Sequence, residues 1–325
     1  MISQPAIDLF EPAEEFVFEG PGTRDWGSGL GRSEPPRPLI PSPQSLVARS
    51  FTEASFTAAV EEIRKNIGAG NVYQVNLSVA ERYRVSQSPW ETYLRLREIN
   101  PSPWMGFADF GDWQLVSGSP ELLVERFPDS DGTSVLRTRP IAGTRKKTGD
   151  AARDNAMRSE LRLDAKEQAE HRMLVDLARN DLGRVADFGT VEVSEREVVE
   201  EYSHVFHLVS EVRARVATRQ SPWEVFLALF PGGTITGTPK ISAMEIISRL
   251  EPVARGMYTG ALGWVGHDDL QFNILIRSAV MRGNEAVVQA GAGIVWDSDP
   301  AREWRESLRK AAAMRAALGV VEPGV

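Results

Sequence analysis

Residues 258–295 read YTGALGWVGHDDLQFNILIRSAVMRGNEAVVQAGAGIV, in which three largely apolar runs are separated by short polar or glycine-containing turns. Apolar runs bounded by turn residues predict β-strands, here over residues 258–267, 270–281 and 285–295. Connections of only a few residues join antiparallel neighbours, because a parallel pair needs a longer crossover. This segment therefore predicts antiparallel sheet.

Helices and further strands flank this segment. Apolar residues at helical spacing, with Ser or Thr starts and Gly or Pro stops, predict helices, and alternation of apolar and polar residues predicts strands. We expect helices over residues 51–70, 88–100, 152–180, 221–230, 241–252 and 300–318, a strand over 73–85, paired strands within 104–127 and short strands within 191–216. Strands with interspersed helices indicate an α+β protein dominated by antiparallel sheet.

Composition narrows the class of protein. The chain has 325 residues, of which 42% are hydrophobic and 25% charged, as in ordinary globular proteins. A net charge of −8 gives no general attraction to nucleic acid or to anionic membranes, so neither is an expected partner. Cysteine is absent, no long apolar run is present, and the acidic N-terminus does not resemble a secretory signal. We therefore expect a cytoplasmic protein.

Two pairs of glutamates are spaced three residues apart, Glu167/Glu170 in KEQAEH and Glu303/Glu306 in REWRES. That spacing places both members of a pair on one helical face. Exposed glutamates are common on helices, so two solvated faces are one interpretation. The other is a shared cation site, since four gathered carboxylates repel each other and oxygen ligands suit Mg²⁺.

Three glycine-rich loops carry the next signal: residues 140–147 (PIAGTRKK), 231–240 (PGGTITGTPK) and 289–295 (QAGAGIV). None matches a phosphate-binding loop, and each taken alone fits a tight turn. Glycine also lets backbone N–H groups approach an anion closely. Together with Arg277 and Tyr258, the loops favour a ligand that carries a carboxylate.

Ten segments, in this order along residues 50–317, resemble the chorismate-binding family, which includes component I of the anthranilate and aminodeoxychorismate synthases, isochorismate synthases and salicylate synthases. These segments are YQVNLS, NPSPWM, SGSPELL, RPIAGTR, KEQAEHRMLVDLARNDLGRV, EYSHVFHLVS, FPGGTITGTPK, YTGALGW, FNILIRS and QAGAGIVWDSDPAREWRES. The resemblance implies large antiparallel sheets that form a sandwich-like core with helices packed outside. It also implies a catalytic domain over residues 49–320, preceded by a Pro/Gly-rich segment, residues 1–48, that is the remnant of a longer N-terminal region.

The resemblance also implies roles for individual residues. Glu170 and Glu306 would bind Mg²⁺ directly, with Glu167, Glu303 and Glu121 completing an acidic shell around the metal. The expected substrate contacts are Arg277 and Tyr258 on the enolpyruvyl carboxylate, assisted by the backbone of Gly291, Ala292 and Gly293 and by the hydroxyls of Thr234, Thr236 and Thr144. The implied substrate is chorismate.

Within this resemblance, the residue at position 74 distinguishes relatives that aminate chorismate from relatives that add water to it. Relatives that add water carry a lysine general base at this position, whereas glutamine cannot take up a proton. Ammonia needs no such base, so Gln74 favours amination. In the family a glutamine amidotransferase subunit supplies the ammonia. The absence of cysteine excludes such a subunit with a Cys nucleophile from this sequence, so a partner chain is expected.

Two products remain open at this point. Ala142 stands in PIAGT where many aminodeoxychorismate synthases have a lysine that forms a covalent adduct with the substrate. His207 matches a histidine that is linked to pyruvate elimination in anthranilate synthases. A purely structural role of this histidine is the alternative. YQVNLS, SGSPELL, PGGTITG and FNILIR favour aminodeoxychorismate synthase component I, our first choice over anthranilate synthase component I. Lys240 is a candidate cation near the leaving group. An inactive chorismate-binding or scaffold protein is the remote alternative.

Overall fold

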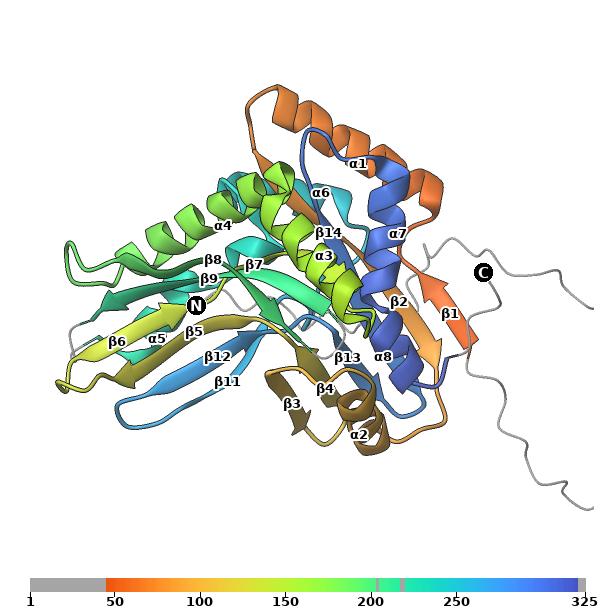
Figure 1. Cartoon of the computed structure of the whole chain (residues 1–325). Helices are drawn as coiled ribbons and strands as arrows, with labels where there is room; N and C mark the ends of the chain where they lie inside the picture. Colours follow the sequence, from red (N-terminus) through yellow and green to blue (C-terminus); the bar gives the residue numbers. More distant parts are fainter. Residues whose placement is uncertain (1–44, 203–204, 217–219, 321–325) are drawn as a thin grey trace, which may run out of the picture.

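The computed structural model describes residues 45–202, 205–216 and 220–320, which form two antiparallel sheets of seven strands each (Figure 1). Sheet A has the order β1-β2-β14-β13-β4-β3, with β10 also paired to β2, and sheet B has the order β11-β12-β5-β6-β9-β7, with β8 also paired to β9. The strands of sheet A are β1 (Ser45–Arg49), β2 (Gln74–Arg84), β3 (Trp104–Asp109), β4 (Gln114–Ser119), β10 (Gly237–Thr238), β13 (Ser278–Arg282) and β14 (Glu285–Ile294). Those of sheet B are β5 (Leu122–Pro128), β6 (Ser134–Thr138), β7 (Ile141–Lys146), β8 (Glu192–Glu201), β9 (Val205–Arg215), β11 (Ala261–Val265) and β12 (Leu270–Ile274).

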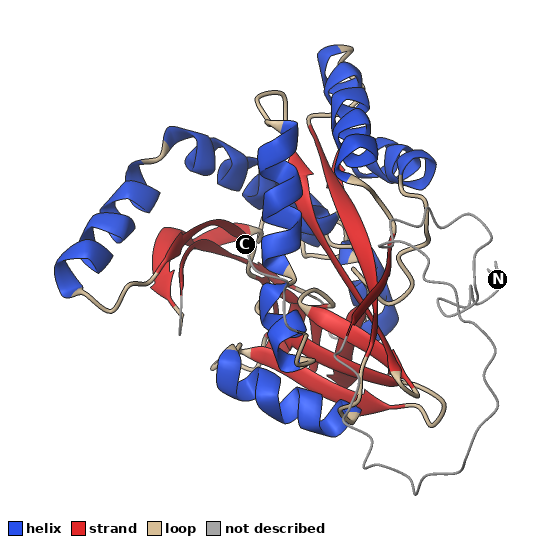
Figure 2. Ribbon diagram, turned by 90° about the vertical axis from the view of Figure 1, so that its right-hand side faces the viewer, coloured by secondary structure: helices blue, strands red, loops and turns tan. Residues whose placement is uncertain are grey.

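Helices cover the outer faces of the sheets (Figure 2). They are α1 (Glu53–Gly68), α2 (Pro89–Ile99), α3 (Ala151–Leu163), α4 (Ala165–Gly183), α5 (Pro222–Leu229), α6 (Lys240–Leu250), α7 (Pro300–Lys310) and α8 (Ala312–Ala317), with one 3₁₀ turn at Gly233–Ile235. The predicted α+β architecture with sandwich-like sheets and external helices is confirmed. Within the described residues, no helix combines the length and apolar character that crossing a membrane requires.

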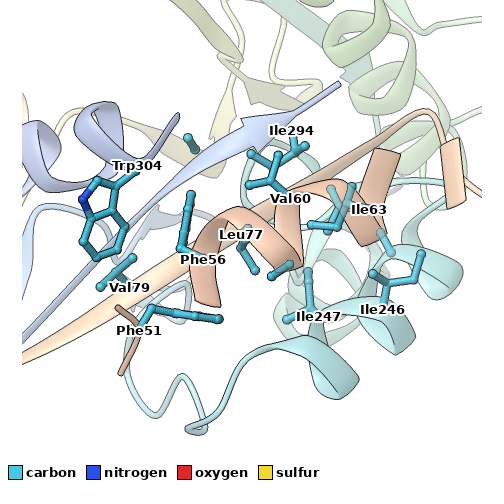
Figure 3. Packing of buried hydrophobic residues seen from close by; sticks show 14 of the residues in the cluster. Phe51, Phe56, Val60, Ile63, Leu77, Val79, Ile246, Ile247, Ile294 and Trp304 are labelled. Carbon is cyan, nitrogen blue, oxygen red and sulfur yellow. The ribbon is translucent and has the colours of Figure 1, made fainter. Parts of the chain in front are cut away.

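The largest core beneath sheet A joins α1, α6 and α7 to β2 and β14 (Figure 3). Phe56, Val60 and Ile63 line one face of α1 and are fully buried, because they recur at helical spacing. Each such side chain contributes roughly 1.5–3 kcal/mol of burial energy. Thr52 and Ser55 form a capping box that starts the helix at Glu53, two residues after the predicted start. The packing fixes the sheet that carries Gln74.

The chain passes between the two sheets four times among the described strands. Two passages are direct, from β4 to β5 through residues 120–121 and from β12 to β13 through residues 275–277. They are hydrogen-bonded to each other, since Gly118 N donates to the Arg277 carbonyl at 3.1 Å and Ile274 N donates to the Glu121 carbonyl at 3.1 Å. The other two run through α5 and the 3₁₀ turn to β10, and through α6 to β11. Candidate site residues lie on all four passages.

We expected one strand over residues 270–281 from their largely apolar sequence, but the structure does not have one. The segment divides into β12 in sheet B and β13 in sheet A, and Arg277 adopts a φ of 53° just before β13. This left-handed conformation is rare for a residue with a side chain and is typical of positions that serve a site. The change of sheet places Arg277 between the two sheets.

Three other expectations need correction. The helix expected over residues 152–180 is two helices, because Asp164 leaves the helical conformation and its carboxylate caps α4 by accepting from Lys166 N and Glu167 N. The helix expected over 300–318 is interrupted at Ala311 between α7 and α8. The strands within 191–216 are 10 and 11 residues long rather than short.

Strand β1 spans the domain boundary that we expected between residues 48 and 49. Its residues pair with β2 in sheet A, from Ser45 opposite Arg84 to Arg49 opposite Glu81. Residues 45–48 thus belong to the sheet, while the rest of the expected Pro/Gly-rich segment lies outside the described residues.

Candidate active site

Both acidic pairs lie on helices, as their spacing predicts, and Glu170 on α4 faces sheet A. Its Oε1 accepts a hydrogen bond of 2.8 Å from Gln74 Nε2 on β2. Gly293 on β14 leaves the room for this contact, because a Cβ there would lie 2.4 Å from Gln74 Nε2. Gln74 Oε1 is buried without a hydrogen-bond partner among the described residues. A buried orphan acceptor next to a buried carboxylate indicates a place for a polar ligand.

The other members of the pairs are held by basic side chains. Glu167 Oε1 lies 3.3 Å from Arg145 Nη1, and the same guanidinium binds Asp164 at 2.8 Å. Glu306 forms an ion pair with Arg309 one helical turn further along α7. Two of the four carboxylates are thus paired with arginine side chains.

Burial and mutual repulsion act on the carboxylates that point inward. Burial raises the pKa of Glu170, and the nearby charge of Glu167 raises it further. Burial also raises the pKa of Glu303, which accepts a 3.0 Å hydrogen bond from Ser298 Oγ, and the charge of Glu306 adds to this increase. A cation in this region would relieve the repulsion.

Lys310 is a site residue that the sequence analysis missed. It lies on α7, its Nζ donates to the Gly291 carbonyl at 3.0 Å, and it is 4.0 Å from Glu306 Oε1. Burial lowers the pKa of Lys310, while the charges of Glu306, Glu170 and Glu303 oppose that effect. Its position four residues after Glu306 and seven after Glu303, on the same helical face, was the signal that could have identified it.

The donor set fits a hard divalent cation in its chemistry. Glu170, Glu303 and Glu306 offer only oxygen atoms, which Mg²⁺ prefers. Among the described residues no three acidic or imidazole side chains converge closely enough to hold a metal ion as they stand. Binding would therefore require these carboxylates to move toward one another.

Glu121 lies on the direct passage from sheet A to sheet B, immediately before β5. Its residue is 5% exposed, and burial raises the pKa of the carboxyl from 4.5 to about 7. The nearby Thr234 hydroxyl and the charge of Lys310 oppose this increase only in part. Thr234 Oγ1 itself is buried, and its contact with Glu121 falls short of hydrogen-bond geometry. Glu121 can therefore hold a proton near neutral pH.

This raised pKa predicts a pH-dependent change in stability. The folded protein binds the Glu121 proton more tightly than the unfolded chain, so stability falls as pH rises from 4.5 through about 7 and is constant above that window. Glu121→Gln removes the buried charge, so its stability relative to the unmodified chain should increase between pH 5 and pH 8 by about 2 to 3 kcal/mol. Urea unfolding at both pH values measures this difference, and exposed Glu62→Gln is the control. An equal difference at both pH values would contradict the assignment.

Arg277 and Tyr258 lie on two different passages between the sheets and influence each other electrostatically. Burial lowers the pKa of the Arg277 guanidinium, and the charge of Glu306 opposes this decrease. Burial raises the pKa of Tyr258, and the Arg255 charge and the nearby Asn76 side chain oppose that increase. A buried guanidinium beside a phenol is suited to an anionic ligand group such as a carboxylate.

Arg255 is a second residue that the sequence analysis missed. Its guanidinium lies over the Tyr258 ring, with Cζ 5.6 Å from the ring centroid. It donates to the Ile235 carbonyl at 2.7 Å, to the Asn76 carbonyl at 2.7 Å and to Glu251. Arg255 thereby ties the loop of Thr234 and the strand of Gln74 to Tyr258. No motif marked it, because the two backbone carbonyls that it joins, those of Ile235 and Asn76, are distant from it in sequence.

The glycines of β14 lie close against β2 and leave no room for a side chain. Gly291 pairs with Ser78 and Gly293 with Asn76 of β2. A Cβ at Gly291 would lie 2.5 Å from the Leu77 carbonyl, so no larger residue fits there. Ala292, which lies between them, belongs to the opposite core with Phe56. Its side chain thus serves packing, and only its backbone is available to a ligand.

His207 on β9 faces the region of Arg277 and Lys310. Its pKa is lowered to about 4, mainly by burial and in smaller part by the charges of Arg277 and Lys310, so the ring is neutral at pH 7. Nδ1 lies 3.0 Å from the Gly143 carbonyl and 3.1 Å from Thr144 Oγ1. Because a carbonyl only accepts, Nδ1 carries the hydrogen and Nε2 is free to take up a proton. Ala142 is buried opposite Leu208 and offers no nucleophile.

Two candidate residues are engaged elsewhere. Lys240 Nζ donates to Asp181 Oδ2 at 2.8 Å and to the Leu229 carbonyl at 3.3 Å. Asp181 lies 11 residues after Glu170 on α4, about 16 Å along the helix. Thr236 Oγ1 donates to the Gly232 carbonyl at 2.8 Å. The structure thus places Lys240 apart from the acidic pairs and assigns the Thr236 hydroxyl to its own loop.

Comparison with known proteins identifies the family of this chain. A profile of the chorismate binding enzyme family matches residues 24–316. Aminodeoxychorismate synthase component 1 of Bacillus subtilis is 48% identical over 88% of this chain and 60% of its own length, and anthranilate synthase component 1 of Neisseria meningitidis is 45% identical over 85% of this chain and 55% of its own length. The crystal structure of anthranilate synthase component I from Streptococcus pneumoniae superposes with a TM-score of 0.76 at 38% identity, covering 84% of this chain and 60% of that one.

This chain therefore belongs to the chorismate binding enzyme family. It spans about 55–60% of the length of the two curated relatives described above. Those relatives carry two different activities on one shared scaffold.

Proposed function

We propose that this chain aminates chorismate with ammonia to give 4-amino-4-deoxychorismate and water, as component I of an aminodeoxychorismate synthase. The observation that carries the proposal is the contact of Gln74 with Glu170 at 2.8 Å. A glutamine in this position cannot deprotonate water, whereas neutral ammonia attacks without a base. The 48% identity to the Bacillus subtilis aminodeoxychorismate synthase component 1 supports this product.

Chorismate is a dianion, so binding it next to five glutamates requires cations. We assign the enolpyruvyl carboxylate to Arg277 and Tyr258, which already interact electrostatically with each other. The ring carboxylate is assigned to the region of Glu170, Glu303 and Glu306. There Mg²⁺, if bound by these glutamates, would neutralise the carboxylate and stabilise the negative charge that develops on the ring.

The side chains then act on the ring hydroxyl and on nitrogen. Glu121, whose pKa burial raises to about 7, can donate its proton to the departing hydroxyl, which leaves as water. Gln74 Oε1 has no partner among the described residues and can accept a hydrogen bond from the incoming amine. Ala142 cannot form a covalent adduct, so ammonia attacks the ring directly. A glutamine amidotransferase subunit is the proposed source of ammonia.

Anthranilate is the second candidate product. His207 favours it, because its neutral ring leaves Nε2 free to remove the proton that aromatises the ring after amination and loss of pyruvate. The 45% identity to the Neisseria meningitidis anthranilate synthase component 1 points the same way. In the first proposal, His207 remains neutral and the enolpyruvyl group stays attached.

Product analysis tests the proposal. The purified chain is incubated with chorismate, Mg²⁺ and an ammonium salt, and the products are separated by chromatography. We expect a non-aromatic amine that becomes p-aminobenzoate only after addition of a separate lyase. Formation of fluorescent anthranilate without a lyase would show that the product is anthranilate and not 4-amino-4-deoxychorismate. Binding of chorismate by calorimetry with no amine formed would favour a non-catalytic binding protein.

A further inference from the structure

Strand β2 has an apolar face and a polar face. Three of its residues belong to the apolar core that contains Phe56, namely Val75, Leu77 and Val79. Because side chains alternate along a strand, Gln74, Asn76 and Ser78 lie on the other face. Gln74 binds Glu170 from this polar face, so the face belongs to the candidate active site.

Two of the three polar side chains on this face are hydrogen-bonded through their donors, and the third is not. Gln74 Nε2 donates to Glu170 at 2.8 Å. Ser78 Oγ donates to Glu251 at 2.7 Å. Asn76 lies between them and is 6% exposed, but its Nδ2 has no hydrogen-bond partner within the part of the chain that the structure describes. A buried amide nitrogen without a partner opposes folding, and a ligand that pairs with it removes this cost.

The backbone of Asn76 is held on both sides. Its N–H donates to the Thr236 carbonyl at 2.8 Å, and its carbonyl accepts from Arg255 Nη2 at 2.7 Å. It also pairs in register with Gly293 of β14. Its amide is therefore a donor whose backbone is fixed before any ligand binds, which lowers the entropy cost of binding.

The Asn76 amide lies near Tyr258. Burial raises the pKa of Tyr258, and the Asn76 side chain is close enough to oppose that increase, although the two groups fall short of hydrogen-bond geometry. Arg255 connects the two residues, because its guanidinium binds the Asn76 carbonyl and lies over the Tyr258 ring. The charge of Arg277 also acts on Tyr258. A guanidinium, a phenol and a neutral amide thus serve one region.

These donors select the kind of group that can pair with Asn76 Nδ2. An amide nitrogen only donates, so it would occupy the lone pair of ammonia and hinder its attack. A carboxylate has two oxygens and accepts several hydrogen bonds at once. Arg277 supplies the positive charge that a buried carboxylate needs. The enolpyruvyl carboxylate, which we assign to Arg277 and Tyr258, meets these conditions.

We propose that Asn76 is a further substrate-binding residue, which donates from Nδ2 to the enolpyruvyl carboxylate of chorismate beside Arg277 and Tyr258. The inference rests on the proposed function and adds a contact to it. It is independent of the product, because both candidate reactions begin with the same carboxylate on the ring.

Asn76→Leu tests this contact, because leucine has a similar volume and no donor. The dissociation constant of chorismate, measured by calorimetry in Mg²⁺, should increase about tenfold or more, while kcat at saturating chorismate should stay within about threefold. Asn76→Ala, which removes the donor without adding bulk, should give the same result. Asn155→Leu, at an exposed position of α3, is the matched control and should bind as the unmodified chain does.

Unchanged binding by both Asn76 variants would overturn this contact and leave the amination intact. Failure of the unmodified chain to bind chorismate would overturn the proposed function together with the contact.

Thermal unfolding separates binding from a structural role. Because Asn76 Nδ2 has no partner among the described residues, its loss should leave the unfolding midpoint of the free chain unchanged or higher. Asn273→Leu is the contrast, since Asn273 is equally buried but donates to the Trp104 carbonyl at 2.6 Å and accepts from Leu262 N at 3.1 Å. That variant should unfold at a lower temperature. An equally low midpoint for Asn76→Leu would assign its amide to folding and overturn the proposal.

An analogue of chorismate without the enolpyruvyl group, a dihydroxycyclohexadiene carboxylate, shows which carboxylate Asn76 binds. This analogue keeps only the ring carboxylate. Its dissociation constant, measured by competition with chorismate, should differ less than about twofold between Asn76→Leu and the unmodified chain. A loss as large as that for chorismate would place Asn76 at the ring carboxylate and contradict the proposed contact.

Discussion

Glu170→Gln should abolish most of the amination activity and at the same time stabilise the folded chain. The amide oxygen can still accept the hydrogen bond from Gln74, so the local geometry is retained and only the charge is lost. Loss of a charged group that holds the cation and substrate should lower kcat/KM about a thousandfold, or ~4 kcal/mol of transition-state stabilisation. Burial and Glu167 raise the pKa of Glu170, so its ionised form opposes folding at neutral pH and its removal should raise the unfolding midpoint.

Steady-state kinetics and thermal unfolding of the same preparation measure the two effects. Glu62→Gln, on the exposed side of α1, is the control and should change neither. A purely structural role of Glu170 predicts lower stability together with lower activity. Full activity in this variant, or full activity of the unmodified chain in excess chelator, would refute the acidic site.

Lys310→Met should weaken chorismate binding about a hundredfold, the second largest effect that we expect. The ammonium group interacts with Glu306, Glu170 and Glu303 and donates to the Gly291 carbonyl at 3.0 Å. Methionine has a similar length but leaves these carboxylates without that cation, so a dianionic substrate meets stronger repulsion. The dissociation constant of chorismate, measured by calorimetry in Mg²⁺, gives the result directly.

Arg305→Met is the matched control for this substitution, because Arg305 is an exposed cation on the same helix. It should leave the dissociation constant unchanged. If both variants bind chorismate equally weakly, the effect comes from the overall charge of α7. If neither binds more weakly, Lys310 has no part in the site.

The parts of this site that were predictable from the sequence are those encoded by local spacing. Glu167 with Glu170 and Glu303 with Glu306 are close in sequence and lie on helices, so helical periodicity located them. The antiparallel architecture followed for the same reason, since short turns between apolar runs leave little choice of topology. Lys310 was within reach of the same argument but was not recognised.

The parts that escaped prediction depend on long-range contacts. Residues 270–281 are largely apolar and contain no glycine or proline, so nothing local indicated that the chain leaves sheet B and enters sheet A before Ser278. Asp164 interrupts the expected long helix because its carboxylate caps α4, an alternative that helical periodicity does not reveal. Arg255 and Lys240 are defined by partners at least one element away, Asn76 for one and Asp181 for the other.

The four passages between the sheets have a consequence for how such a chain can vary. Each carries a group proposed to touch the ligand or its surroundings, namely Glu121, Thr234, Tyr258 and Arg277. An added or deleted residue in one of them would shift a ligand contact and the register of two sheets together. The outer hairpins at residues 266–269 and 283–284 carry no such double constraint. Insertions and deletions should therefore accumulate in those hairpins. The four passages between the sheets should keep their length and vary only in the identity of their side chains.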